Sequence, residues 1–266
     1  MENTSKTQTL IDIRNVSLEY GTKNNSILAI KDINIEINQG EFLCILGPSG
    51  CGKSTLLNII AGYIKPTTGT CAMKGKQITG PDWHRGVVFQ TPTLYPWMSV
   101  NDNVEFGPKM RGLPRDEIEQ IRLHFLQQVH LSGFGDKSTF ELSGGMKQRV
   151  ALARVLANYP ALILMDEPFG ALDALTRTNM QILVRDIWSK NKVTFFLITH
   201  DIDEALSLGT RVMVMSKRPG ILLKEFNIDF TYNFLNKKSS HIQYTDEYIK
   251  IKYEILDIIN EQIDQK

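Results

Sequence analysis

Cysteine is scarce in this chain of 266 residues, and the three that occur, Cys44, Cys51 and Cys71, show no CxxC spacing. A sparse and odd set of thiols excludes a disulfide framework and is typical of a reduced, intracellular protein. Net charge is also small, because 30 basic and 29 acidic side chains leave a balance of +1. Without an excess of positive charge, the chain has no strong field with which to collect nucleic acid or anionic lipid.

Long hydrophobic runs are absent as well. No segment approaches the roughly 18 apolar residues that a membrane-spanning helix needs, so we expect the chain not to cross a bilayer by itself. It could still dock on a protein that does. The first nine residues are polar and lack the apolar stretch of a signal peptide. Apolar residues make up 42% of the chain, which excludes a mostly disordered protein. The length allows one large domain or two small ones.

The apolar pattern predicts short strands with helices between them. Residues 10–46 are predicted to be β-structure with a turn at 21–25. Their last strand, 41–46, leads through a glycine loop into a helix over 54–61. Further apolar strands are expected at 86–89, 161–165, 193–198 and 211–215. Uninterrupted apolar runs of this length suit a sheet that is covered on both faces, so the pattern predicts a parallel α/β core.

A helical insertion is expected within that core. Proline and glycine punctuate the beginning of the segment, and helices are then predicted over 115–129 and 146–157. We place the insertion at about 91–160, inside a domain that covers 1–230.

Residues 231–266 are predicted to form a C-terminal extension with a helix. Thr245 is a suitable N-cap, and apolar residues recur at helical spacing from Tyr248 onward. Two interpretations stay open for this helix. It packs on its own domain, or it binds a partner or a second copy.

A glycine-rich loop follows the strand at 41–46 and matches the pattern GxxxxGK[ST]. Its glycines let backbone N–H groups surround a phosphate, and the following helix points its positive end at the same place. Lys53 can reach the β and γ phosphates, and the Ser54 hydroxyl can bind Mg²⁺. Cys51 is either a small loop residue or a redox-sensitive thiol. The residues expected to bind the phosphates are Gly47, Pro48, Ser49, Gly50, Cys51, Gly52, Lys53, Ser54 and Thr55.

Polar residues end three of the predicted strands. Asp166 can hold Mg²⁺ through its water shell, and Glu167 can activate the attacking water as a general base, worth about 10²–10⁴-fold in rate. Gln90 can reach the Mg²⁺ or the water. His200 either contacts the γ-phosphate or is an ordinary surface residue. Because α/β sheets bind ligands at the carboxyl ends of their strands, we expect these side chains at one edge.

A second anion-binding site is predicted at Ser143, Gly144 and Gly145, directly before the helix over 146–157. A serine and bare backbone N–H groups at a helix N-terminus form an anion site. Two such sites in one chain suggest that one ATP is clamped between two copies of the protein.

This ordered set of motifs resembles the ATP-binding-cassette (ABC) family over nearly the whole chain. The loop at 47–55 is similar to Walker A, 142–148 to the family signature, and 162–167 to Walker B. Single residues also match their family positions: Gln90 in the Q-loop, Asp173 in the D-loop, His200 as the switch histidine and Tyr20 as the aromatic that stacks on adenine. Met146 stands where the family signature usually has glutamine.

The resemblance implies a P-loop NTPase (RecA-like) core with an N-terminal antiparallel β subdomain and an inserted helical subdomain. It implies an ATPase that uses ATP and Mg²⁺ and works as a head-to-tail dimer. In that dimer, Walker A of one chain and Ser143–Gly145 of the other enclose each ATP.

The stretch 94–107 resembles the ATPase subunits of nitrate, sulfonate and taurine importers, although Tyr95 replaces their more usual leucine. This implies a subunit that energises import of a small anion at the cytoplasmic face of the cell membrane. The implied partners are a second ATPase subunit, membrane permease subunits that dock near Gln90–Gly107, and a substrate-binding protein, with no nucleic acid. The alternatives are a soluble ABC ATPase of DNA repair, translation or cofactor assembly, and the cassette of a half-exporter.

Overall fold

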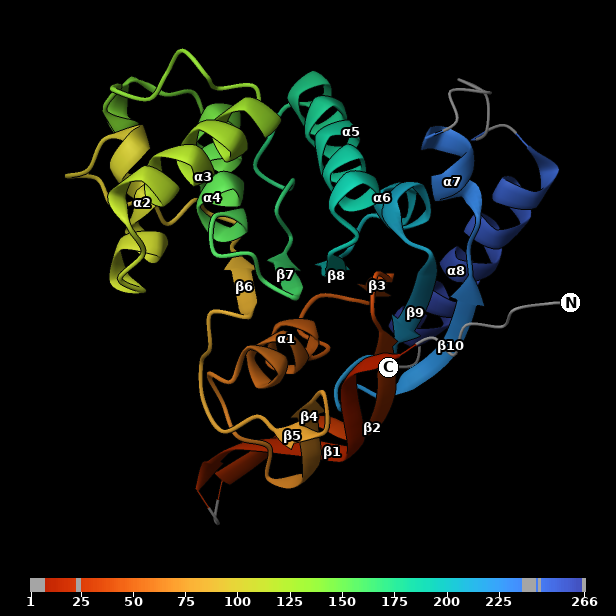
Figure 1. Cartoon of the computed structure of the whole chain (residues 1–266). Coiled ribbons are helices and arrows are strands. Elements are labelled where there is room, and N and C mark those ends of the chain that lie inside the picture. The colour runs from red at the N-terminus through yellow and green to blue at the C-terminus, as the bar shows by residue number, and fades with distance from the viewer. Residues whose placement is uncertain (1–7, 23–24, 236–242, 244, 265–266) are drawn as a thin grey trace, which may run out of the picture. The chain divides into compact units, whose positions relative to one another are not determined.

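The computed structural model describes residues 8–22, 25–235, 243 and 245–264 (Figure 1). The chain divides into two compact units. Unit 1 combines residues 1–82 with 192–266, and unit 2 consists of residues 83–191. The predicted limits of the main domain, the insertion and the C-terminal extension stay predictions. Among the described residues, none of the helices combines the length and apolar character that crossing a membrane requires.

Unit 1 begins with an antiparallel sheet, as the sequence predicts. Its strands are β1 (Thr9–Thr22), β2 (Asn25–Asn38), β4 (Thr68–Met73) and β5 (Lys76–Gln77), in the order β2-β1-β4-β5. The second half of β2 alternates between buried and exposed positions, which is the pattern of a strand with one covered face. The predicted turn at 21–25 lies partly outside the described residues.

A second sheet of unit 1 carries the apolar strands. Its order is β10-β9-β3-β8, and β3 runs parallel to both β8 and β9. Every residue of β3 and β8 is buried, which confirms that the continuous apolar runs belong to strands covered on both faces. The strands are β3 (Phe42–Leu46), β8 (Thr194–Thr199), β9 (Arg211–Met215) and β10 (Leu222–Asn227), and the accompanying helices are α1 (Lys53–Ala61) and α6 (Ile202–Leu208).

The C-terminal part of unit 1 contains α7 (Phe230–Leu235) and α8 (Asp246–Asp264). Thr245 Oγ1 accepts a hydrogen bond from the Tyr248 backbone N–H at 3.3 Å, which confirms the predicted cap. The buried Tyr248 donates its hydroxyl to Asp203 Oδ1 at 2.9 Å, so α8 packs on its own unit. Helix α8 also exposes Ile249, Tyr253 and Leu256, and the partner-binding interpretation stays a prediction.

Unit 2 is mostly helical around one pair of parallel strands, β6 (Arg85–Val88) and β7 (Leu162–Asp166). Its helices are α2 (Val100–Met110), α3 (Arg115–Gln128), α4 (Gly144–Leu156) and α5 (Ala174–Asn191), with a 3₁₀ turn at Thr139–Glu141. The predicted helices over 115–129 and 146–157 are confirmed as α3 and α4. Helix α2 was not predicted, because Gly107 and Pro108 in its last turn are residues typical of loops.

Candidate nucleotide-binding site

The loop between β3 and α1 is shaped around its glycines. Gly50 and Gly52 have φ angles of 75° and 107°, in the left-handed region that favours glycine. A Cβ atom at Gly52 would lie 2.4 Å from Ile30 Cγ2, and one at Gly47 would lie 2.9 Å from Cys51 Sγ. Side chains are therefore excluded, and the backbone itself forms the inner surface of the loop.

Lys53 is held inside this loop. The side chain is only 5% exposed, and Nζ donates hydrogen bonds to the carbonyls of Gly47 at 2.7 Å and Pro48 at 3.0 Å. Ser54, one position further along α1, is exposed. A glycine cradle, a buried ammonium group and an exposed hydroxyl in the first helical turn fit a polyphosphate with its magnesium ion.

Tyr20 lies beside the start of the same helix. It comes from β1, and its hydroxyl lies 3.2 Å from Thr55 Oγ1 while the residue keeps 42% of its surface exposed. The structure thus brings the predicted adenine-stacking residue to the phosphate loop, although the two lie far apart in the sequence. A half-exposed aromatic ring at this place can stack on a nucleobase.

Cys51 is 1% exposed and packs against the loop that it belongs to. Burial raises the pKa of its thiol, so little of the reactive thiolate exists at neutral pH. The structure therefore favours the interpretation of Cys51 as a small packing residue over that of a redox-sensitive thiol.

His200 leaves the sheet beside the phosphate loop. In the parallel pairing of β3 with β8, Leu46 lies opposite Thr199. The next residues, Gly47 and His200, therefore leave neighbouring strands at the same edge. Asp201 then caps α6 by accepting the Glu204 N–H at 3.1 Å, which holds the segment after His200 in place.

The other strand-end residues come together in unit 2. Val88 and Met165 are paired across β6 and β7, so Gln90 and the pair Asp166–Glu167 leave the sheet at one edge. A Cβ at Gly170 would lie 3.4 Å from Gln90 Nε2, which places the glutamine amide against the turn after β7. Ser54 at the beginning of α1 and Asp166 at the end of β7, two of the predicted magnesium ligands, belong to different units, and their pairing stays a prediction.

Glu167 has a strained backbone. Its φ of 43° lies in the left-handed region, which costs a non-glycine residue about 1–3 kcal/mol and is concentrated at functional sites. Both Asp166 and Glu167 are half-buried at the carboxyl end of an otherwise buried strand. This geometry suits a general base that must be aimed at one water molecule.

Asp173 has a structural contact in addition to its predicted role. Its Oδ1 accepts the Thr176 backbone N–H at 3.0 Å at the beginning of α5. Hydrogen bonds from Thr176 hold the pKa of the Asp173 carboxyl below its ordinary value. The bond from the Thr176 N–H orients the carboxylate, which is charged at neutral pH.

Ser143, Gly144 and Gly145 lie at the beginning of α4. The Ser143 hydroxyl caps the helix by accepting the Met146 N–H at 3.3 Å. A Cβ at Gly144 would meet open space, whereas one at Gly145 would lie 2.5 Å from Thr176 Cγ2. The turn is therefore open on the side of Gly144, where the helix N-terminus can receive an anion.

Two further residues near these segments were missed from the sequence. Arg218 donates from Nε and Nη2 to the Gly50 carbonyl, both at 3.3 Å, and so contacts the backbone of the phosphate loop. Gln148 is 1% exposed and donates from Nε2 to the Phe89 carbonyl at 3.1 Å. A glutamine inside the signature motif was a visible signal for the second contact, but no local pattern indicated the first.

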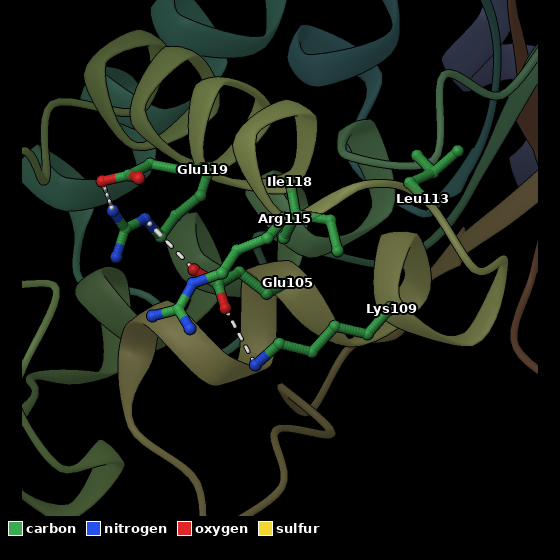
Figure 2. A pocket seen from close by; sticks show the side chains of 7 residues that line it. Glu105, Lys109, Leu113, Arg115, Ile118 and Glu119 are labelled. Atoms are coloured by element: carbon green, nitrogen blue, oxygen red, sulfur yellow. Dashed lines mark hydrogen bonds and ion pairs between the residues drawn. The ribbon is translucent and has the colours of Figure 1, made fainter.

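Unit 2 also contains a hollow of about 430 Å³ (Figure 2). Its walls are formed by α2, α3 and the turn between them, and Figure 2 shows Lys109 and Glu105 turned toward each other. Two ion pairs lie in its wall, Lys109–Glu105 at 2.8 Å and Arg122–Glu105 at 3.3 Å. None of the predicted nucleotide-binding residues lines this hollow.

The glycine cradle with its buried lysine, between a parallel strand and a helix, defines a P-loop NTPase. The ABC transporter family profile matches residues 30–170. The chain belongs to the ABC transporter family and is an ATPase of that family. The predicted fold class is confirmed.

Similar proteins come from both sequence and structure. The taurine import ATP-binding protein TauB of Roseobacter denitrificans is 47% identical over 94% of this chain and 93% of its own length. CbiO1 of Clostridium perfringens, part of the ABC transporter complex cbiONQ, has a TM-score of 0.75 and 28% identity over 93% of this chain and 99% of that one. The ATP-binding cassette MJ0796, solved as a dimer in a post-hydrolysis state with ADP and Pi, has a TM-score of 0.71. It is 32% identical and covers 83% of this chain and 99% of its own.

These relatives distinguish an importer ATPase from a soluble ABC ATPase. The sequence relative is a taurine import ATP-binding protein, and the structural relatives are a bacterial ABC transporter cassette and a part of an ABC transporter complex. The interpretation as an importer ATPase is confirmed over that of a soluble repair or translation ATPase.

Proposed function

We propose that this chain hydrolyses ATP to energise import of a small sulfonate such as taurine. The observation that carries the proposal is the 47% identity to a taurine import subunit, which extends over 94% of the chain. Nitrate and other sulfonates are the other cargoes considered. The ATPase subunit does not contact the cargo, so its own site residues carry no information about it.

ATP binding would fall mainly to unit 1. The loop at 47–52 surrounds the phosphates with backbone N–H groups, and Lys53 turns from its loop carbonyls toward the β and γ phosphates. Tyr20 stacks on the adenine. Ser54 and Asp166, with Gln90, would hold Mg²⁺, directly or through water. When bound, the ion neutralises phosphate charge and fixes the leaving group in line.

Hydrolysis would depend on the strand-end residues. Glu167 accepts a proton from the attacking water, and its strained backbone aims the carboxylate. His200 contacts the γ-phosphate from the edge of β8, and Gln90 orients the water. Asp173, fixed by Thr176, helps to shape the site at the dimer interface.

The site would be completed by a second copy. Ser143, Gly144 and Gly145 present an open helix N-terminus, which serves the γ-phosphate bound by the partner chain. The dimeric state of the MJ0796 cassette supports this arrangement. Closure on ATP and opening after hydrolysis would then drive the attached permease.

Permease subunits would dock near Gln90–Gly107, on the cytoplasmic face of the membrane. Trp97 in this stretch is 76% exposed, which is unusual for the largest aromatic side chain. Tyr95 lies beside it, with ring centroids 5.7 Å apart. A substrate-binding protein would deliver the cargo to the permease.

The test combines capture with transport. Glu167→Gln should bind ATP but turn over about 10²–10⁴-fold more slowly, because the general base is lost. Tagged Glu167→Gln protein, captured from detergent-solubilised native membranes with Mg-ATP, should bring down a polytopic protein without ATPase motifs. Adding Trp97→Ala should release it, whereas the matched control Tyr63→Ala, an exposed aromatic just after α1, should not.

Cargo is then read from uptake. Cells that lack this chain should lose uptake of radiolabelled taurine and recover it with the wild-type chain, but not with Glu167→Gln. If these cells lose uptake of nitrate and keep uptake of taurine, the proposed cargo is wrong and the proposed importer function stands. Capture of soluble proteins or nucleic acid only would overturn the importer itself.

A further inference from the structure

Helix α4 holds the chain on both sides of Gln90. Before Gln90, the carbonyl of Phe89 accepts Gln148 Nε2 at 3.1 Å. After Gln90, the Thr93 carbonyl accepts Arg154 Nη1 at 2.7 Å, and Thr93 Oγ1 accepts Arg154 Nη2 at 3.2 Å. We call these contacts of Gln148 and Arg154 the α4 clamp.

Stability alone does not account for Gln148. The residue is 1% exposed, and within the described residues its Oε1 is buried without a hydrogen-bond partner. A buried polar atom left unpaired costs about 1–3 kcal/mol, which offsets what the bond from Nε2 contributes. Methionine has a similar shape and no such cost. Because glutamine gains little stability over methionine here, its bond to the Phe89 carbonyl is the property that distinguishes it at this position.

Packing around the clamp makes α4 and the preceding strand one block. A Cβ at Gly86 of β6 would lie 2.2 Å from Val155 Cγ1, so the helix lies directly on the strand. Beyond Thr93, the Arg154 guanidinium lies 5.2 Å from the centre of the Tyr95 ring. A displacement of residues 89–95 must therefore move the helix as well, because close-packed contacts transmit strain.

The two ends of this block have different predicted partners. Ser143 at the beginning of α4 faces the nucleotide of the second copy, and the chain beyond Tyr95 leads to exposed Trp97 at the permease side. We propose that the α4 clamp couples these two ends, with Gln148 and Arg154 as positioning residues that link ATP-driven closure to the docking segment. This inference rests on the proposed function, which supplies both partners.

Hydrogen exchange in the full-length Glu167→Gln protein, with and without Mg-ATP, tests the coupling. We expect ATP to slow exchange at 47–55, where it binds, and to change exchange at 89–97. Adding Gln148→Met or Arg154→Lys should leave the first response intact and abolish the second. Lysine keeps the charge of Arg154 but cannot make its two hydrogen bonds to Thr93 in the same geometry.

A matched control lies on the same helix. Arg149 makes no hydrogen bond to residues 89–93 in the part of the chain that the structure describes, and Arg149→Gln should leave both responses unchanged. The melting temperature of Gln148→Met should stay within about 2 °C of the parent, because the lost bond and the removed unpaired atom nearly cancel.

The outcomes separate the two proposals. An 89–97 response that persists in both Gln148→Met and Arg154→Lys would overturn the coupling and leave the ATPase assignment untouched. A parent that responds at 47–55 but not at 89–97 would do the same. No response at 47–55 in the parent would refute the ATP site first, and the coupling with it.

Discussion

The chain begins two helices with glycine-rich turns, one in each unit, and the surroundings of the two turns differ. Before α1, Gly52 is the N-cap and makes no side-chain cap. Before α4, the Ser143 hydroxyl caps the helix. Gly47 and Gly52 are crowded by neighbouring atoms, whereas Gly144 faces open space. The same local chemistry thus forms an enclosed cradle in one place and an open surface in the other.

The difference teaches which turn binds by itself and which needs a partner. The cradle at 47–52 has its own buried cation, because Lys53 is folded into it. The turn at 143–145 presents the N-terminus of α4, and its N-cap residue Ser143 is exposed. Changes in the cradle should therefore abolish binding by a single chain, and changes in the turn should act only when two chains meet.

Lys53→Ala should have the largest effect. Removing the ammonium group takes away a charge-assisted contact worth about 1.5–3 kcal/mol, so ATP affinity should fall by at least about tenfold and turnover should vanish. Titration with a fluorescent ATP analogue measures this, with Lys65→Ala as the control. Normal turnover in Lys53→Ala would refute the cradle as the phosphate site.

Ser143→Arg separates the two turns. A bulky cation at the open turn should prevent closure of the dimer and strongly reduce turnover, while the ATP affinity of the monomer stays near that of the wild type. The readout is the ratio of the two losses, measured by equilibrium binding at low protein concentration and by steady-state hydrolysis. Equal loss of both would mean that Ser143 acts on the nucleotide of its own chain.

Tyr20→Ala should lower the affinity for ATP by about tenfold, because stacking of a base on an aromatic ring contributes about 1–3 kcal/mol. Tyr20→Phe removes only the contact with Thr55 and keeps the ring, so its affinity should remain close to wild type. Competition between ATP and inorganic triphosphate checks the reason, since Tyr20→Ala should not change triphosphate affinity. A matching loss for triphosphate would place Tyr20 at the phosphates.

Cys51 should show the smallest effect. Because burial raises the pKa of its thiol, the chain at pH 7 should keep its ATP affinity after brief exposure to peroxide. Cys51→Ala should behave in the same way. Reversible loss of binding in the wild type, absent from Cys51→Ala, would restore the redox interpretation.

Much of the fold follows from local patterns. The predicted helix over 115–129 matches α3 at Arg115–Gln128, and the strand over 211–215 matches β9. Helix α2 escaped prediction because Gly107 and Pro108 usually end helices. Gly107 is needed there for another reason, since a Cβ would lie 2.2 Å from Asn158 Oδ1 on a segment distant in sequence.

The phosphate loop, the strand-end carboxylates and the serine-glycine turn were determined by the sequence itself. Their chemistry lies in neighbouring residues, and glycine, lysine and serine have the same conformational and bonding properties wherever they occur. Only the tertiary structure decided that Tyr20 lies at Thr55 and that Gln148 and Arg154 bind the chain on either side of Gln90. Those contacts join residues that are distant along the chain, and their geometry depends on how strands and helices pack rather than on any local pattern.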